Sequence, residues 1–267
     1  MTRLLITVVL LLITHWLVLG EPFPFQASLE RWIWMGLSGL LSLVLGDTLL
    51  FMAFGLVGTR LTMQIACLVP PCTVLMAWFV LGERLTWIQV SGILVTIGGV
   101  ALVISDGRNG ARLPVDRQVY LKGLTLAGGS VLLQTLGGIA AKKGLSGDFP
   151  ALSGHLIRTF ISMVILVVFL LLKGHLNTTL VELKYQPISL RYILIGAIIG
   201  PFIGMWLSLQ AIQNINIGIA TSLTSLSPVW LLPIGYYQFK EHIGLRAIFG
   251  TLLAILGIAI IFLFNGN

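Results

Sequence analysis

One acidic side chain lies where only apolar side chains are expected. Asp47 falls well inside an apolar stretch that runs from Trp32 to Phe54. A charge at membrane depth is costly, so an acid in such a stretch is a candidate functional residue by default. Its carboxyl could carry a proton or pair with a cationic group of a bound solute. The alternative is a protonated or hydrogen-bonded carboxyl that fixes helix packing, and the sequence leaves both interpretations open.

Amides and hydroxyls near an aromatic ring form the second set of candidates for solute binding. They are Gln64, Gln134, Trp206, Gln210, Asn214, Thr221, Ser222 and Ser225. Thr221, Ser225 and Pro228 share one helix face through their i, i+4, i+7 spacing. Trp206, Gln210 and Gln213 share a face on the preceding stretch. Such a set would suit a zwitterionic or amide-bearing solute. Hydrogen bonding between helices is the competing interpretation for each member.

The other chemistry-bearing residues form no catalytic or metal-binding pattern. The histidines are scattered and lack ligand spacing: His15, His155, His175 and His242. Cys67 and Cys72 are five positions apart, which is neither a metal spacing nor a disulfide framework, so free thiols are predicted. Arg158 is expected to snorkel at the start of a helix. Because an enzyme needs a nucleophile with a base, or acids with a metal, at one depth, we predict no catalytic residue, metal, cofactor or enzymatic activity.

The elements that position these residues are predicted to be transmembrane helices. Apolar residues make up 57% of the chain, charged residues 9%, and the mean hydropathy is +1.01. A soluble domain carries about a quarter charged residues. A β-barrel needs alternating apolar and polar residues, whereas the apolar runs here are unbroken. The net charge is +7, but the basic residues stand singly or in pairs between the runs. They are therefore expected to anchor helix ends in a lipid bilayer, and no nucleic acid partner is predicted.

Nine apolar stretches are long enough to cross roughly 30 Å of hydrocarbon. They are Arg3–Gly20, Trp32–Phe54, Leu61–Leu81, Leu85–Ser105, Val119–Ala141, Ala151–Leu172, Tyr192–Gln213, Gly218–Tyr237 and Leu245–Phe264. The connections between them are short and contain nearly all the charges. The first stretch also resembles a cleaved secretory signal, but the internal repeat described next favours a structural helix.

The chain contains an internal repeat with an ungapped offset of 158 positions. It matches Pro70 with Pro228, Glu83 with Glu241, Gly92 with Gly250 and Gly99 with Gly257, since 228 − 70 = 241 − 83 = 250 − 92 = 257 − 99 = 158. Matched prolines, acids and glycines in one register indicate duplication. Pro70 and Pro228 are predicted to kink helices, either beside a watery cavity or only for packing. Gly92, Gly98, Gly99 and Gly257 are predicted to be close-packing contacts.

The repeat divides the chain unequally. Four predicted spans belong to a first repeat at residues 1–105, a polar linker covers 106–118, and five spans belong to a second repeat at 119–267. The counterpart of Asp47 in the second repeat is Met205, so no paired-carboxylate site is expected. A partner for the helix at Val119–Ala141 is missing from the first repeat.

The repeated pattern resembles the EamA family of the drug/metabolite transporter superfamily. It consists of Gly46-Asp47, Pro70, Leu81-Gly82-Glu83-Arg84-Leu85, Gly92 and Gly98-Gly99-Val100, with Pro228, Lys240-Glu241, Gly250 and Gly257 in the second half. The resemblance implies ten helices in two inverted five-helix repeats, a solute cavity between the halves, and export of amino acids or other metabolites. It also implies a bacterial inner membrane. Because the first helix is absent here, the chain is either a ten-helix sequence that starts late or a nine-span variant.

Together these features predict an all-α polytopic membrane protein with two inverted repeats and about nine transmembrane helices. The leading hypothesis is an exporter of a small metabolite, such as an amino acid, that works by alternating access, with proton coupling as an open option. The alternatives are a non-transporting or lipid-translocating membrane subunit and, less favoured, a membrane-embedded enzyme. The distribution of Lys and Arg places the C-terminus outside, whereas the resemblance implies a C-terminus inside, so the orientation stays open.

Overall fold

Every regular element in the described part of the chain is a helix. The computed structural model describes residues 2–82, 86–110, 117–174, 193–215, 217, 220–221 and 245–263. Six segments there are long and apolar enough to cross a membrane: Thr2–Leu19, Leu29–Thr59, Leu61–Val80, Arg117–Gly144, Ala151–Leu172 and Ile193–Asn214. Two shorter apolar helices cover Trp87–Leu102 and Ile248–Ile261. The predicted all-α membrane class is confirmed. The count of nine stays a prediction, because the span at Gly218–Tyr237 lies almost wholly outside the described residues.

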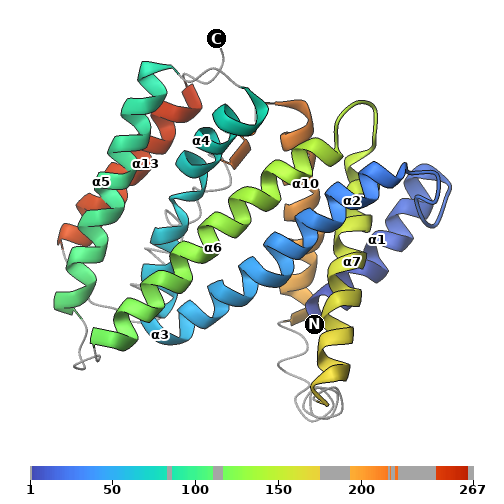
Figure 1. The fold of residues 1–267 in the computed structure, drawn as a ribbon, viewed down its shortest axis with the longest axis horizontal. Coiled ribbons are helices and arrows are strands. Elements are labelled where there is room, and N and C mark those ends of the chain that lie inside the picture. The colour runs from blue at the N-terminus through green and yellow to red at the C-terminus, as the bar shows by residue number, and fades with distance from the viewer. Residues whose placement is uncertain are drawn as a thin grey trace. The chain divides into compact units, whose positions relative to one another are not determined.

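The helices are coloured in chain order in Figure 1. They are α1 (Thr2–Leu19), α2 (Leu29–Ser38), the π-helix η1 (Gly39–Gly46), α3 (Asp47–Ala66), α4 (Val69–Leu81), α5 (Trp87–Gly110), α6 (Arg117–Gly144), α7 (Ala151–Leu172), the π-helix η2 (Ile198–Gly204), α10 (Met205–Asn214) and α13 (Leu245–Leu263). The bounds of α7 match the predicted span, and those of α1 differ from it by one residue at each end.

The second predicted span is a continuous helix made of three parts. α2 begins after Ser28, whose hydroxyl accepts a hydrogen bond from the N–H of Arg31 and so caps the helix. η1 then passes into α3 without a break, because Gly46 keeps a right-handed helical backbone. Gly58, with φ 82°, interrupts α3 and separates this span from the next. Only glycine adopts such an angle at little cost.

Pro70 begins a helix, and this corrects the prediction that it lies in a helix interior. α3 ends at Ala66, Cys67 and Leu68 form a turn, and Pro70 occupies the first turn of α4. The N–H groups of Cys67 and Leu68 bond three residues back, at 3.2 and 2.9 Å, which tightens the end of α3. Proline is tolerated in a first turn because the N–H it lacks has no helical partner there. Its counterpart, Pro228, lies outside the described residues.

The chain divides into two compact units, and each unit contains segments from both predicted repeats. The first unit is Met1–Val44 with Ala140–Asn214, and the second is Leu45–Ile139 with Ile215–Asn267. α7 is the central helix of the first unit, where it packs against α1, α2 and α10. Its N-terminal part, from Ala151 to Thr159, is buried throughout.

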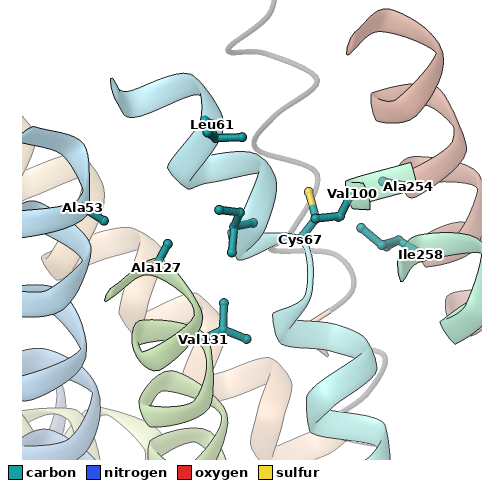
Figure 2. Packing of buried hydrophobic residues seen from close by; sticks show 9 residues of the cluster. Ala53, Leu61, Cys67, Val100, Ala127, Val131, Ala254 and Ile258 are labelled. Carbon is teal, nitrogen blue, oxygen red and sulfur yellow. The ribbon is translucent and has the colours of Figure 1, made fainter. Parts of the chain in front are cut away.

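The second unit has an apolar core to which four helices contribute (Figure 2). Ala53, Leu61 and Ile65 come from α3, Val100 from α5, Ala127 and Val131 from α6, and Ala254 and Ile258 from α13, with Cys67 at the end of α3. Small alanines at these positions let helices approach closely, as is usual within membranes. Both cysteines are free thiols, as predicted, with Cys67 buried and Cys72 half-buried.

The repeat glycines join α5 to α13, which lie side by side in Figure 1. A Cβ added at Gly92 would lie 2.9 Å from the carbonyl oxygen of Gly257, and one at Gly99 would lie under 3.0 Å from Gly250 O and Ala254 N. The predicted close-packing role is therefore confirmed for Gly92, Gly99 and Gly257. It is wrong for Gly98, where the nearest atom to an added Cβ is Leu253 Cδ2 at 3.9 Å. Because the earlier glycine of one helix meets the later glycine of the other, the two helices run antiparallel.

The offset of 158 also recurs in the bounds of the helices. α5 begins at Trp87 and α13 at Leu245, so that 245 − 87 = 158, and η1 ends at Gly46 and η2 at Gly204, so that 204 − 46 = 158. Two pairs of elements therefore begin or end at matching places of the predicted repeat. Neither π-helix was predicted.

Candidate functional site

Asp47 lies at the junction between the π-helix η1 and the α-helix α3. It is half-buried, inside the membrane span Leu29–Thr59. An acid in the first turn of a helix is usually stabilised by unpaired N–H groups and the helix dipole. Here that explanation does not apply, because η1 continues the helix on the N-terminal side and Gly46 provides no break. Asp47 therefore does not lie at a free helix N-terminus.

The carbonyl next to Asp47 is held by two polar residues of α6. Ser130 is fully buried and donates its hydroxyl to Gly46 O at 2.9 Å. Gln134, one turn further along α6, donates its amide to Ser130 Oγ at 2.9 Å. The prediction named Gln134 but missed Ser130, although the spacing of four residues placed Ser130 on the same face. Asp47 and Gln134 are thus brought to one region of the second unit.

Gln64 bridges two helices of the second unit. Its amide donates to Thr251 Oγ1 of α13 at 2.9 Å, and the side chain is 3% exposed. This contact is a hydrogen bond between two helices, which was the alternative to a solute-binding role for Gln64. The amide oxygen, Oε1, is buried and accepts no hydrogen bond from the described residues. Among the described residues, no donor therefore reaches the Gln64 amide oxygen. Sequence spacing could not reveal this.

The candidates on α10 belong to the first unit and face different surroundings. Trp206 is half-buried, its ring lies tilted against that of Phe202 with ring centroids 6.3 Å apart, and it packs on a core of Leu11, Leu152 and Leu156. Gln210 and Asn214 are exposed, and Asn214 donates to Gln210 O at 2.7 Å. Of these three candidates, only Trp206 packs on this core.

Gln213 fastens the connection between α6 and α7. Its amide nitrogen donates to Phe149 O at 2.7 Å and lies 3.2 Å from Gly147 O. Lys142 complements it by donating to the carbonyl of Ile212 at 2.6 Å, where a cation meets the carbonyl end of α10. The function of Gln213 is thus to hold a turn.

Replacing Gln213 with leucine should loosen this turn. We expect hydrogen exchange at the backbone amides of residues 145–149 to rise about tenfold, since several hydrogen bonds are lost and each is worth about 1 kcal/mol. Mass spectrometry on the peptide that contains the turn measures the change. Gln210→Leu is the matched control, because its exposed side chain lies on the same helix. Equal exchange in the two variants would contradict the role assigned to Gln213.

The last predicted candidates are only partly within the described residues. Thr221 is half-buried, and its hydroxyl donates to Ile217 O at 2.8 Å, four residues earlier in the chain. Ser222 and Ser225 lie outside the described residues, as do His175 and His242. In the described residues no group of three or more His, Cys, Asp or Glu is arranged to hold a metal ion.

Buried polar residues of α7 were the main feature that the sequence analysis missed. Arg158 is 4% exposed and donates to Ser42 Oγ, so the prediction that it snorkels to the surface is wrong. It lies two turns into α7, within the stretch from Ala151 to Thr159 that is buried throughout. His155 is 1% exposed, and its Nε2 lies 2.7 Å from Pro201 O. His15 of α1 joins Glu21 O to the hydroxyl of Ser153.

Comparison with known proteins gives a family and a fold. Residues 1–105 and 121–263 match the sequence model of the EamA-like transporter family. A crystal structure of a protein is similar over 97% of this chain and 85% of its own, with a TM-score of 0.66 and 19% sequence identity. That likeness concerns the fold alone. A comparison with curated proteins finds no match in sequence.

Proposed function

We propose that this chain, which belongs to the EamA-like transporter family, carries a small metabolite across the membrane by alternating access between two inverted repeats. A transporter-type membrane protein is what the family match and the apolar helices support directly. The inverted relation is supported by α5 and α13, which occupy equivalent places in the repeat and pack antiparallel through equivalent glycines. Inverted repeats of this kind bind their substrate near the bilayer midplane.

The observation that carries the proposal is the acid Asp47, half-buried inside a membrane span. A carboxyl at this depth is expensive unless the function requires it. Ser130 and Gln134 hold the backbone beside it, so its position is fixed. We infer that the carboxyl binds the ammonium of an amino-acid-like solute or a coupling proton, and that amides nearby complete the site. Export is the direction that the family favours, and the inner membrane of a bacterium is the expected location.

Flux measurements in reconstituted vesicles test the proposed function. The unmodified chain should release labelled amino acids from loaded proteoliposomes faster than vesicles without protein, and an imposed proton gradient should change that rate if protons are coupled. The panel should include cationic, neutral and acidic amino acids, with a fluorescent phospholipid as a separate arm. No flux of any amino acid from a folded protein would sink the proposal. Phospholipid movement alone would favour the lipid-translocating alternative.

A further inference from the structure

The described part of the chain contains two π-helices, which occupy equivalent places in the two predicted repeats. η1 ends at Gly46 and η2 at Gly204, 158 positions apart, and the next residues, Asp47 and Met205, begin α3 and α10. π-helical hydrogen bonding is rare, mostly one turn long, and concentrated at functional sites. Its occurrence twice at equivalent positions indicates a feature of the repeat and not a local irregularity.

A single helix donates hydrogen bonds to both π-helices. Arg158 of α7 donates through Nη2 to Ser42 Oγ of η1, and the Ser42 hydroxyl in turn donates a hydrogen bond to Ser38 O at 2.6 Å. His155, three residues earlier on α7, contacts Pro201 O of η2 at 2.7 Å. Because a carbonyl oxygen only accepts, Nε2 of His155 must be the protonated nitrogen. Residues three apart on a helix are neighbours on its surface.

Close packing strengthens the contact between η1 and α7. A Cβ added at Gly39, the first residue of η1, would lie within 2.5 Å of the carbonyl oxygen of Arg158 and would also meet Ser162 Oγ. The first turn of η1 therefore rests directly on the backbone of α7. Every residue in these contacts belongs to the first unit, and both donors are almost fully buried.

We propose that Arg158 and His155 are positioning residues that hold the windings of η1 and η2, respectively. The winding of a helix sets the direction in which the next residues point, because π and α turns contain different numbers of residues. Asp47 is the residue that directly follows η1 in the chain. The consequence for transport rests on the proposed function, whereas the positioning itself does not.

Hydrogen exchange of the protein in lipid nanodiscs tests the proposal. Mass spectrometry should follow peptides that cover Gly39–Gly46 and Ile198–Gly204. Arg158→Met and Ser42→Ala should each raise exchange in the η1 peptide about fivefold, the effect of one lost buried hydrogen bond, and leave the η2 peptide unchanged. His155→Phe should do the reverse. His155→Gln, which retains an N–H donor, should keep exchange in η2 near that of the unmodified chain.

Ser153→Ala is the matched control, because Ser153 is a buried polar residue of the same helix that bonds His15 and not a π-helix. It should leave both peptides unchanged. If every variant raised hydrogen exchange in both peptides, or if no variant changed exchange in either, the proposal would be overturned. If Arg158→Met does not fold, Ser42→Ala still decides the η1 part. In the flux assay, Ser42→Ala should lower the rate and Ser153→Ala should not. Absent flux in the unmodified chain would refute the transport function while the exchange data still decide the positioning.

Discussion

Replacing Asp47 with asparagine should lower solute flux in reconstituted vesicles by at least about tenfold, while expression and folding stay intact. The substitution removes the charge and keeps the volume, and hydrogen bonds to charged groups contribute about 1.5–3 kcal/mol. The amide can neither carry a proton nor balance an ammonium group. Initial rates of solute release, measured with and without a proton gradient, give the size of the effect. Retained counterflow with lost gradient dependence would identify proton coupling as the role of the carboxyl.

Glu30→Gln is the matched control for Asp47→Asn. Glu30 is an exposed acid in the first turn of α2, so the same chemical change there should leave flux unaltered. Asp47→Glu keeps the charge and should restore part of the flux. The competing interpretation is a carboxyl that only fixes packing. It predicts that Asp47→Asn lowers thermal stability together with flux, and that outcome would remove Asp47 from the binding site.

The spans were predictable because their signal is length and hydropathy. The helix at Ala151–Leu172 was predicted at its observed bounds, since an apolar run begins after Pro150 and a lysine follows it. The repeat was equally accessible, because glycines and prolines matched in one register are rare by chance. Close packing was predicted for Gly92, Gly99 and Gly257, which the structure places between α5 and α13, and also for Gly98, where the structure shows no close contact.

The local winding of the helices could not be predicted from hydropathy. A π-turn uses the same apolar side chains as an α-turn, so Gly39–Gly46 reads like any other part of its span. Pro70 was predicted inside a helix because the apolar run continues past it, whereas the backbone breaks at Cys67 and Leu68. The hydrogen bonds that end a helix depend on backbone angles, and these cannot be predicted from amino-acid composition.

The candidate site was predicted in its residue types but not in its surroundings. Spacing establishes that two residues share a helix face, but not what the face meets. Gln64 therefore proved to bond Thr251, and Gln210 is exposed although it shares a face with Trp206. Arg158 was assigned to the surface because an arginine in an apolar run usually snorkels. Its burial against Ser42 depends on tertiary packing, which the sequence does not show.

Replacing Gly99 with valine should push α5 away from α13 and lower the free energy of unfolding by a large amount. The added Cβ would lie under 3.0 Å from Gly250 O and Ala254 N, which are backbone atoms and cannot turn aside. Overpacking typically costs 1–3 kcal/mol, and we expect about 3 kcal/mol here, or roughly 5–10 °C in Tm for a chain of this size. Thermal unfolding in detergent, followed by circular dichroism, measures the shift.

Gly98→Val provides the control within the same turn of α5. The nearest atom to a Cβ at Gly98 is Leu253 Cδ2 at 3.9 Å, an ordinary contact with the end of a flexible side chain. The two variants add the same atoms to neighbouring positions, so intrinsic helix propensity and hydrophobicity cancel between them. A Tm for Gly98→Val as low as that for Gly99→Val would refute the antiparallel glycine contact. A difference of several degrees would support it, and with it the inverted relation of the repeats, because α5 and α13 meet through residues that the repeat itself duplicates.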